Sequence, residues 1–450
     1  MRQRVVLNSD SISLTSGSIA KNMIQFSLPL VCTNLLQVLF SMVDVAVVGK
    51  YAGTTALGAV GSTPNLLFLF VGLLTGLGSG VNAIMAYYVG AKDKKSVDET
   101  IYTAFLFCIF SGFALCVLGI AFAKTMLSAM NTKPDLLSGA VLYFRIYMVS
   151  MPAAAIYNFG NGVFSAIGET KKPLYFLALS GVVNIALDLF FVICFEMNVA
   201  GVAYATVIAQ YISAVLMMIF LIRGNGQVHF SLRALQIERT KLARIVSIGL
   251  PAGMQNAIFA FANVFVQIGV NSFDSLMVAG TSASANIDPL IYDVMAAFYV
   301  ACSTFIAQNY GAGNKIRVLN CFFVATAISF FIGLVLGTLL FFFGPSVLGL
   351  FTSDGRVIEC ALRRVKILAF SYCVSAFMDS AISACRGLGK TLVPSVFVLL
   401  GSCVFRIAWI YTIFAHFGTI ESLFLLYVFS WGITALFESA YFYRIYKAAF

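Results

Sequence analysis

"IGETKKP" at Ile167–Pro173 returns as "LGKTLVP" at Leu388–Pro394, so a segment of the first half of the chain recurs in the second. "YVGAKDKKSV" at Tyr88–Val97 matches "NYGAGNKIRV" at Asn309–Val318 at the same offset of about 221 residues. Three further pairs keep the order: "SLP" at 27–29 with "GLP" at 249–251, "YFRI" at 143–146 with "RVKI" at 364–367, and "NIA" at 184–186 with "RIA" at 406–408. Five ordered matches at one offset indicate a duplicated architecture.

The later copy also looks like the end of a nucleotide-binding loop, because it contains Gly389–Thr391, "GKT". Such a loop needs a further glycine five residues before Gly389, where this chain has Ala384, and it should follow a β-strand. The earlier copy has Glu169 in place of the lysine. We therefore expect a turn between two helices, with glycines ending one helix and Pro394 opening the next, and no nucleotide or other cofactor.

The composition points to a membrane protein. Hydrophobic residues make up 60% of the 450 residues, charged residues only 10%, and the mean hydropathy is +0.95. Soluble domains carry about 25% charged residues, so we expect the lipid bilayer to surround most of this chain. The net charge of +10 is scattered between apolar runs, which argues against a nucleic-acid partner. The ten cysteines lie mostly in apolar runs without metal-ligand spacing, so no metal site is expected from them.

Apolar runs long enough to cross a membrane occur twelve times. Lysine and arginine are unevenly placed around these runs: with the N-terminus inside, 19 lie on the cytoplasmic side and seven on the outer side. This distribution predicts a multi-pass protein of the cell (inner) membrane with both termini in the cytoplasm. The predicted spans lie near 22–48, 58–88, 99–123, 137–165, 174–196, 200–222, 244–272, 277–309, 318–343, 358–384, 394–416 and 422–443.

Six spans in each half make the two copies parallel in the membrane. We therefore predict an all-α integral membrane protein with twelve transmembrane helices in two six-helix lobes. The lobes should be related by a pseudo-two-fold axis along the membrane normal, with a cavity between them. The predicted N-lobe is 1–222, the cytoplasmic linker 223–243 and the C-lobe 244–450.

Carboxylates inside predicted spans are the first candidates for function, because each costs roughly 2.5–3.5 kcal/mol on insertion scales. Asp44 and Asp188 lie roughly 35 Å and 22 Å along their helices from the inner surface, which puts both in the outer half of the N-lobe. Asn184 shares a helix face with Asp188, and Thr206 lies at a compatible depth. These oxygens suit Na⁺, whereas a desolvated Asp44 could carry a proton instead, and the sequence leaves both open.

Several motifs together resemble the multidrug and toxic compound extrusion (MATE) family of secondary transporters. The resemblance covers essentially the whole chain and implies export of small organic, often cationic compounds in exchange for H⁺ or Na⁺. It also suggests a protein that works as a monomer. The motifs are "SLP" at 27–29, "FSMVDVAVVGKYAG" at 40–53, "AIGETKKPL" at 166–174, "NIALD" at 184–188, "GVAYAT" at 201–206 and "IAQNYGAGNK" at 306–315.

The resemblance also implies a cation site in the N-lobe. Residue by residue, the family pattern falls on Asp44, Asn184, Asp188, Thr206 and Tyr143, although Tyr147 lies one turn from Tyr143. Pro29 stands where the related transporters have a kink in the first span, and its missing N–H makes a bend physically plausible.

In the C-lobe the candidates are substrate-cavity residues. Other family branches carry a glutamate in span seven where this chain has Phe259, so a second cation site stays open. Glu438 is interpreted as reaching the interface, and Arg145 as an anchor at the outer interface. Arg406 has either a structural partner or a substrate contact. The predicted cavity residues are Asp288, Asp293, Asp379, Gln255 and Arg406.

Three other functions remain in view. A lipid-linked oligosaccharide flippase of the same superfamily should line its cavity with more cationic residues. An unrelated twelve-span solute importer would differ in the direction of ion-coupled flux. A membrane enzyme is disfavoured, because His229 and His416 have no catalytic partner at motif spacing.

Overall fold

The computed structural model describes residues 12–130, 132–224, 228, 230, 231 and 234–450, and these residues form helices and connecting turns with no β-strand. His229 and five other residues of the predicted linker, 225–227, 232 and 233, lie outside the described residues. The first half of the chain contains α1 (Ile19–Val47), η1 (Val48–Ala52), α2 (Gly53–Gly61), α3 (Pro64–Ala91), α4 (Lys94–Ala129), α5 (Pro134–Met148), α6 (Met151–Ala166), α7 (Lys171–Leu189), η2 (Phe190–Cys194) and α8 (Asn198–Arg223).

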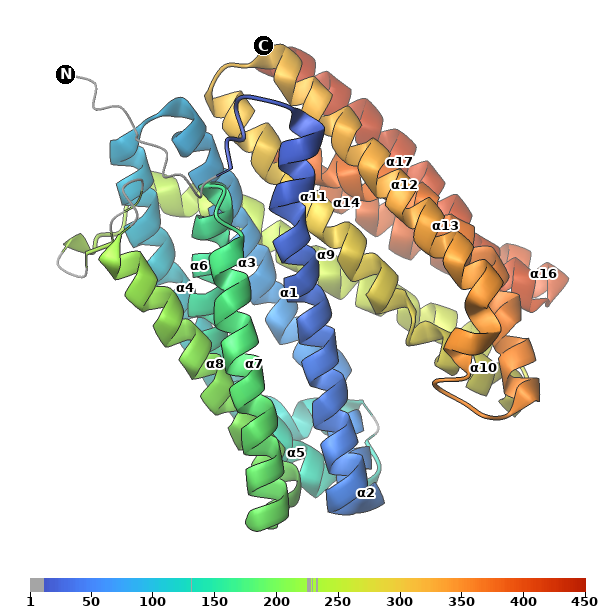
Figure 1. Cartoon of the computed structure of the whole chain (residues 1–450). Coiled ribbons are helices and arrows are strands. Elements are labelled where there is room, and N and C mark those ends of the chain that lie inside the picture. Colours follow the sequence, from blue (N-terminus) through green and yellow to red (C-terminus); the bar gives the residue numbers. More distant parts are fainter. Residues whose placement is uncertain (1–11, 131, 225–227, 229, 232–233) are drawn as a thin grey trace. The chain divides into compact units, whose positions relative to one another are not determined.

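The second half begins with a helix of 32 residues and repeats the same kind of elements (Figure 1). It contains α9 (Arg239–Val270), α10 (Ser275–Ala285), α11 (Asp288–Gly311), α12 (Lys315–Leu348), α13 (Gly355–Gly387), α14 (Leu392–Val398), η4 (Leu399–Val404), α15 (Phe405–Trp409), η5 (Ile410–Phe414), α16 (Ala415–Phe417) and α17 (Ile420–Ala449). Elements labelled η are π-helical turns, of which η1, η4 and η5 lie inside longer helices and η2 ends the helix that begins with α7.

The predicted all-α membrane fold is confirmed. Eleven helical segments among the described residues are long and apolar enough to cross a membrane by themselves. The twelfth span is the pair α5 and α6, which bends by 47° at Val149 and Ser150. Pro152 in the first turn of α6 has no N–H to donate, which favours a break at that point.

The chain divides into two compact units. Unit 1 contains Cys32–Gly253 with the described residues 12 and 13, and unit 2 contains Leu14–Val31 with Met254–Phe450. The first part of α1 thus belongs to unit 2, and the first part of α9 belongs to unit 1. Pro29 and Pro251 lie inside these helices, each within three residues of the change of unit. The kink at Pro29 and the lobe boundaries at 222 and 244 stay predictions.

Glycines bring α3 and α9 into backbone contact within unit 1. Gly76 and Gly80 of α3 lie against Gly249 and Gly253 of α9, so that two glycine pairs of spacing i, i+4 face each other. A β-carbon at Gly80 would lie 2.8 Å from the backbone nitrogen of Gly249, and one at Gly76 would overlap the backbone of Gly253. Small residues of this spacing are the usual device by which helices in a membrane approach closely.

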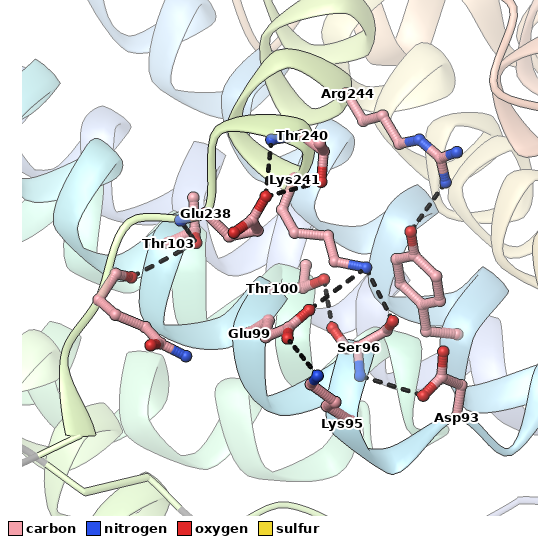
Figure 2. A network of polar contacts seen from close by, with 12 residues as sticks. Asp93, Lys95, Ser96, Glu99, Thr100, Thr103, Glu238, Thr240, Lys241 and Arg244 are labelled. Atoms are coloured by element: carbon pink, nitrogen blue, oxygen red, sulfur yellow. Dashed lines mark hydrogen bonds and ion pairs between the residues drawn. The ribbon is translucent and has the colours of Figure 1, made fainter.

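A polar cluster holds the start of α9 to the connection between α3 and α4 (Figure 2). The Nζ atom of Lys241 donates to Ser96 Oγ at 2.8 Å, lies 3.6 Å from Glu99 Oε2, and sits 4.0 Å from the ring centroid of Tyr88. Arg244 donates to the hydroxyl of the same Tyr88 at 2.8 Å. These contacts explain why the first turns of α9 belong to unit 1.

Asp93 completes this cluster by capping α4, and it accepts a hydrogen bond from the backbone N–H of Ser96 at 3.2 Å. Hydrogen bonding from Ser96 keeps the pKa of the Asp93 carboxyl below its usual range. A carboxylate at this position also complements the positive end of the helix.

The repeated stretch at Asn309–Val318 makes equivalent hydrogen bonds in unit 2, where it holds the segment that leads into α1. Asn309 donates to the carbonyl of Leu14 at 3.0 Å, and Arg317 donates to the carbonyls of Ser16 and Gly17, both at 2.9 Å. In each unit the connection after its second long helix therefore fixes the segment that leads into α1 or α9. This shared task gives a physical reason for the sequence match between 88–97 and 309–318.

Replacing Lys241 with methionine is expected to lower the free energy of unfolding by about 1–3 kcal/mol, because Ser96 and Glu99 then lose a buried charged donor. Lys95→Met is the matched control, since Lys95 approaches Glu99 at 3.8 Å with 87% of its side chain exposed. The control should change stability by less than about 0.5 kcal/mol. Thermal unfolding in detergent measures both, and equal melting temperatures for wild type and K241M would contradict the anchoring role.

The stretches at 167–173 and 388–394 form turns between helices, as predicted. Gly168 and Gly389 adopt φ angles of +82° and +76°, which side chains disfavour. The N–H of Lys390 donates to the carbonyl of Cys385 at 2.9 Å, closing the end of α13. The N–H of Glu169 donates to Phe164 at 2.9 Å in the same way at the end of α6.

Candidate cation-binding site

Three helices of unit 1 bring the predicted acidic residues together. Asp44 comes from α1, Asp188 and Asn184 from α7, and Thr206 from α8. The Thr206 hydroxyl lies 3.3 Å from Asp44 Oδ2, and the carboxyl groups of Asp44 and Asp188 lie beside each other. Asp188 is fully buried and Asn184 is 5% exposed, whereas Asp44 is half-buried. The cluster can therefore be reached through Asp44.

The cluster is short of hydrogen-bond donors. Within the described residues, no N–H or O–H group reaches either oxygen of Asp188 or the Oδ1 atom of Asp44. The amide nitrogen of Asn184 also makes no hydrogen bond there. Buried oxygens without donors are costly, and two adjacent carboxylates cannot both stay ionised without a compensating charge. The chemistry of this donor set therefore suits a proton shared between the carboxyls, or a hard cation such as Na⁺ held by oxygens.

Tyr143 and Tyr147 of α5 border the two carboxylates. Tyr143 is 5% exposed and lies close enough to Asp44 and Asp188 to interact with both electrostatically. Tyr147 interacts with Asp44, and the two tyrosine rings are 6.1 Å apart. The structure thus gathers all five predicted residues and adds Tyr147, which differs from Tyr143 by one helical turn. Their role in cation binding stays a prediction.

A π-helical turn begins shortly after each carboxylate. Asp44 is followed by η1 and Asp188 by η2. Nearby, Gly181 of α7 lies directly under the ring of Phe40 of α1, where a β-carbon would overlap the ring. π-Helical turns in α-helices are frequent at functional sites, and the close approach of α1 and α7 fixes the two carboxylates relative to each other.

The comparison with protein families decides the identity of the fold and of its repeat. The sequence profile of the MatE family matches this chain twice, over residues 29–190 and 251–412. The chain belongs to the MatE family. The resemblance stated from the sequence motifs is therefore confirmed, and the two matches begin at Pro29 and Pro251, 222 residues apart.

Relatives of this MatE chain cover most of its length. "Probable multidrug resistance protein YoeA" of Bacillus subtilis is 26% identical over 84% of the chain and 83% of its own length. The "FAD transporter" of Shewanella oneidensis is 24% identical over 81% of each protein. Among solved structures, the "outward-facing conformation of a multidrug resistance MATE family transporter of the MOP superfamily" covers 98% of the chain and 99% of its own, with a TM-score of 0.91 and 21% identity. This structural likeness supports the fold.

Outside the acidic cluster, this MatE chain has buried charges in unit 2. Asp288 forms an ion pair with Arg364 and accepts a hydrogen bond from the Tyr372 hydroxyl at 2.6 Å. Its negative charge is therefore already matched. Asp293 follows one turn later on α11 and is half-buried. The predicted place of both in a substrate cavity stays a prediction.

A second acidic region lies between α13 and α17. Asp379 is 6% exposed, and its Oδ2 atom has no hydrogen-bond donor within the described part of the chain. Arg386, two turns further along α13 and close enough to interact with Asp379, donates to Gln255 at 3.1 Å. Glu438 of α17 is fully buried, so the interpretation that it reaches the interface is wrong. The cause is packing, because α17 lies along α13, and α13 covers the Glu438 side chain.

The two remaining predicted arginines differ from each other. Arg145 is exposed in unit 1 and donates to the carbonyl of Ile120 at 3.3 Å, as suits an anchor near the membrane surface. Arg406 is 1% exposed inside unit 2 and bonds Asn263 and Ser430. Asn263 is the residue that sequence reasoning missed, since a lone asparagine in an apolar span carries no pattern.

Proposed function

We propose that this MatE protein is a cation-coupled antiporter that exports small organic, often cationic compounds in exchange for H⁺ or Na⁺. The observation that carries the proposal is a pair of adjacent carboxyls in a membrane-spanning region, the half-buried Asp44 and the buried Asp188. Within the described residues, no donor reaches Asp44 Oδ1 or either oxygen of Asp188. The names of multidrug-resistance relatives support the substrate class.

Coupling follows from the charge of the site. A monovalent cation entering through Asp44 compensates one of the two carboxylate charges, removes their mutual repulsion and draws α1, α7 and α8 together. Pro29 interrupts the hydrogen bonding of α1, so the helix bends there and changes the N-lobe cavity, which releases the substrate. Cation and substrate must favour different states of an alternating-access cycle, since a ligand with equal affinity for both states shifts nothing.

The proposed location is the cell (inner) membrane, with both termini in the cytoplasm, and transport needs neither a cofactor nor a chemical reaction. The alternatives are a lipid-linked oligosaccharide flippase and another twelve-span transporter. The acidic cluster favours the antiporter, because a flippase should line its cavity with more cationic residues, whereas the core of the N-lobe offers mainly carboxylates.

A dye-transport assay in inverted membrane vesicles tests the proposal. We expect transport of a cationic dye to follow either an imposed pH gradient or an imposed Na⁺ gradient, and to stop when an ionophore removes that gradient. The gradient that works identifies the coupling ion. Transport that depends on neither gradient would contradict coupling. In inverted vesicles an exporter moves the dye into the lumen, so gradient-driven movement of dye out of the lumen would identify an importer.

A further inference from the structure

Arg406 is a buried cation whose contacts are all neutral. Its Nη1 donates to Asn263 Oδ1 at 3.0 Å, its Nε donates to Ser430 Oγ at 3.3 Å, and its guanidinium lies 4.4 Å from the ring centroid of Tyr427. No aspartate or glutamate among the described residues forms an ion pair with it. An unmatched buried charge is costly, and within a membrane such a residue marks a functional pathway.

Two other arginines of unit 2, the buried Arg364 and the half-buried Arg386, each have a carboxylate partner. Arg364 pairs with Asp288, and Arg386 interacts with Asp379. Arg406 also lies roughly 21 Å along its span from Leu392 and roughly 16 Å from Phe417, at 1.5 Å per residue, which is too deep for its side chain to reach either membrane surface. At this depth its counter-ion is not a lipid headgroup in its usual position.

The internal repeat gives the residues that stand at the position of Arg406 and its neighbours in the other half of the chain. Arg406 stands where unit 1 has Asn184, and Arg364 stands where unit 1 has Tyr143. Two of the residues that line the acidic cluster of unit 1 are thus arginines in unit 2. At the offset of 222 residues that joins the two family matches, Asp188 corresponds to the apolar Ile410. The same place in the fold has therefore changed from negative to positive charge.

Two donors converge on a single oxygen at this place. Asn263 Oδ1 accepts from Arg406 Nη1 and also from the Tyr427 hydroxyl at 3.2 Å. An oxygen of a carboxylate or phosphate would meet the same two donors if the Asn263 side chain turned aside. Asn263 is exposed and Tyr427 is half-buried, so this oxygen position can be reached from the surface of unit 2.

The local backbone supports a functional role independently. Arg406 belongs to α15, a segment of five residues between the π-helical turns η4 and η5. π-Helical turns are rare in proteins, and those that occur are often found at functional sites. In unit 1 they likewise follow the two carboxylates of the acidic cluster.

We propose that Arg406 and Tyr427 bind the anionic group of an amphipathic organic substrate, either a carboxylate or a phosphate monoester, at the position that Asn263 Oδ1 occupies. This inference rests on the proposed transport function and adds a substrate class to it, organic anions, recognised in unit 2. The coupling cation remains at Asp44 and Asp188, so the two binding events use different residues.

The chain carries its own reporter for this site. It has two tryptophans, Trp409, one turn after Arg406, and Trp431, whose ring centroid lies 5.3 Å from that of Tyr427. In nanodiscs of phosphatidylcholine we expect 4-phenylbutyrate and phenyl phosphate to change tryptophan fluorescence saturably. The uncharged amide of 4-phenylbutyrate should bind at least tenfold more weakly.

Variants separate the charge from folding. R406Q should weaken binding of the acid at least tenfold, whereas R406K, which keeps the charge, should stay within a few-fold of wild type. N263A removes the oxygen that occupies the anion position without touching a charge, so this variant should bind the acid at least as tightly as wild type. R145Q, at an exposed arginine of unit 1, should leave binding unchanged. Equal binding of acid and amide, or unchanged binding by R406Q, would overturn the proposal.

A lipid arm and a transport arm complete the test. If phosphatidylglycerol in the nanodisc removes the response to both probes, the site holds a lipid headgroup and the substrate proposal is wrong. In vesicles, R406Q should stop export of an anionic dye while export of a cationic dye continues, and D44N should stop both. Because binding is measured without a gradient, a failure of ion coupling would leave the anion site standing and overturn only the antiporter proposal.

Discussion

Replacing Asp44 with asparagine is expected to reduce ion-driven dye efflux to the background of vesicles without the protein. The substitution keeps the shape of the side chain and an oxygen that can accept from Thr206. It removes one of two adjacent buried carboxyls, so the site loses the charge that attracts a cation. The same loss is expected for Asp188→Asn, because both oxygens of Asp188 are buried without a donor in the described residues.

Stability separates loss of coupling from loss of folding. Removing one of two neighbouring acids relieves their mutual repulsion, so the melting temperature of D44N should equal or exceed that of wild type. Asp135→Asn is the matched control, because Asp135 is an exposed aspartate in the first turn of α5 and does not belong to the acidic cluster. D135N should transport at the wild-type rate. Full ion-driven efflux by D44N would exclude Asp44 as a coupling residue.

The sequence predicted the spans and the acidic cluster because both depend on local spacing. A span needs only an apolar run of sufficient length, and Asn184 and Asp188 share a helix face whatever the tertiary fold. The repeat then supplied the correspondence between halves, which the double family match confirms. The joining of Asp44 to Asp188 across helices was inferred from depth in the membrane and from the family resemblance.

Other features depend on which face of each helix is buried, and the sequence does not fix this. Helices of this chain are apolar all round, so no hydrophobic stripe indicates that Glu438 faces α13 and not the interface. The pairing of Asp288 with Arg364 joins residues 76 positions apart and has no local pattern. Asn263 likewise gains its meaning only when α9, α15 and α17 place it beside Arg406 and Tyr427.

The exchange of segments at Pro29 and Pro251 was also beyond sequence reasoning. Glycine pairs at 76, 80, 249 and 253 are visible in the sequence, yet nothing local shows that α3 and α9 are the partners. Their contact assigns the first part of α9 to unit 1.

Adding one methyl group at Gly76 is therefore expected to destabilise the protein, although Gly→Ala in a helix is ordinarily favourable by about 0.5–1 kcal/mol. The β-carbon of alanine would overlap the backbone of Gly253, and backbone cannot rotate away as a side chain can. We expect G76A to lower the free energy of unfolding by about 2–3 kcal/mol, as overpacking does.

Gly61→Ala is the matched control, because a β-carbon at Gly61 of α2 has no neighbour within 4 Å. Thermal unfolding in detergent should show a lower melting temperature for G76A and an equal or higher one for G61A. Equal stability of the two variants would mean that α3 and α9 do not pack backbone to backbone. In that case the start of α9 would not belong to unit 1.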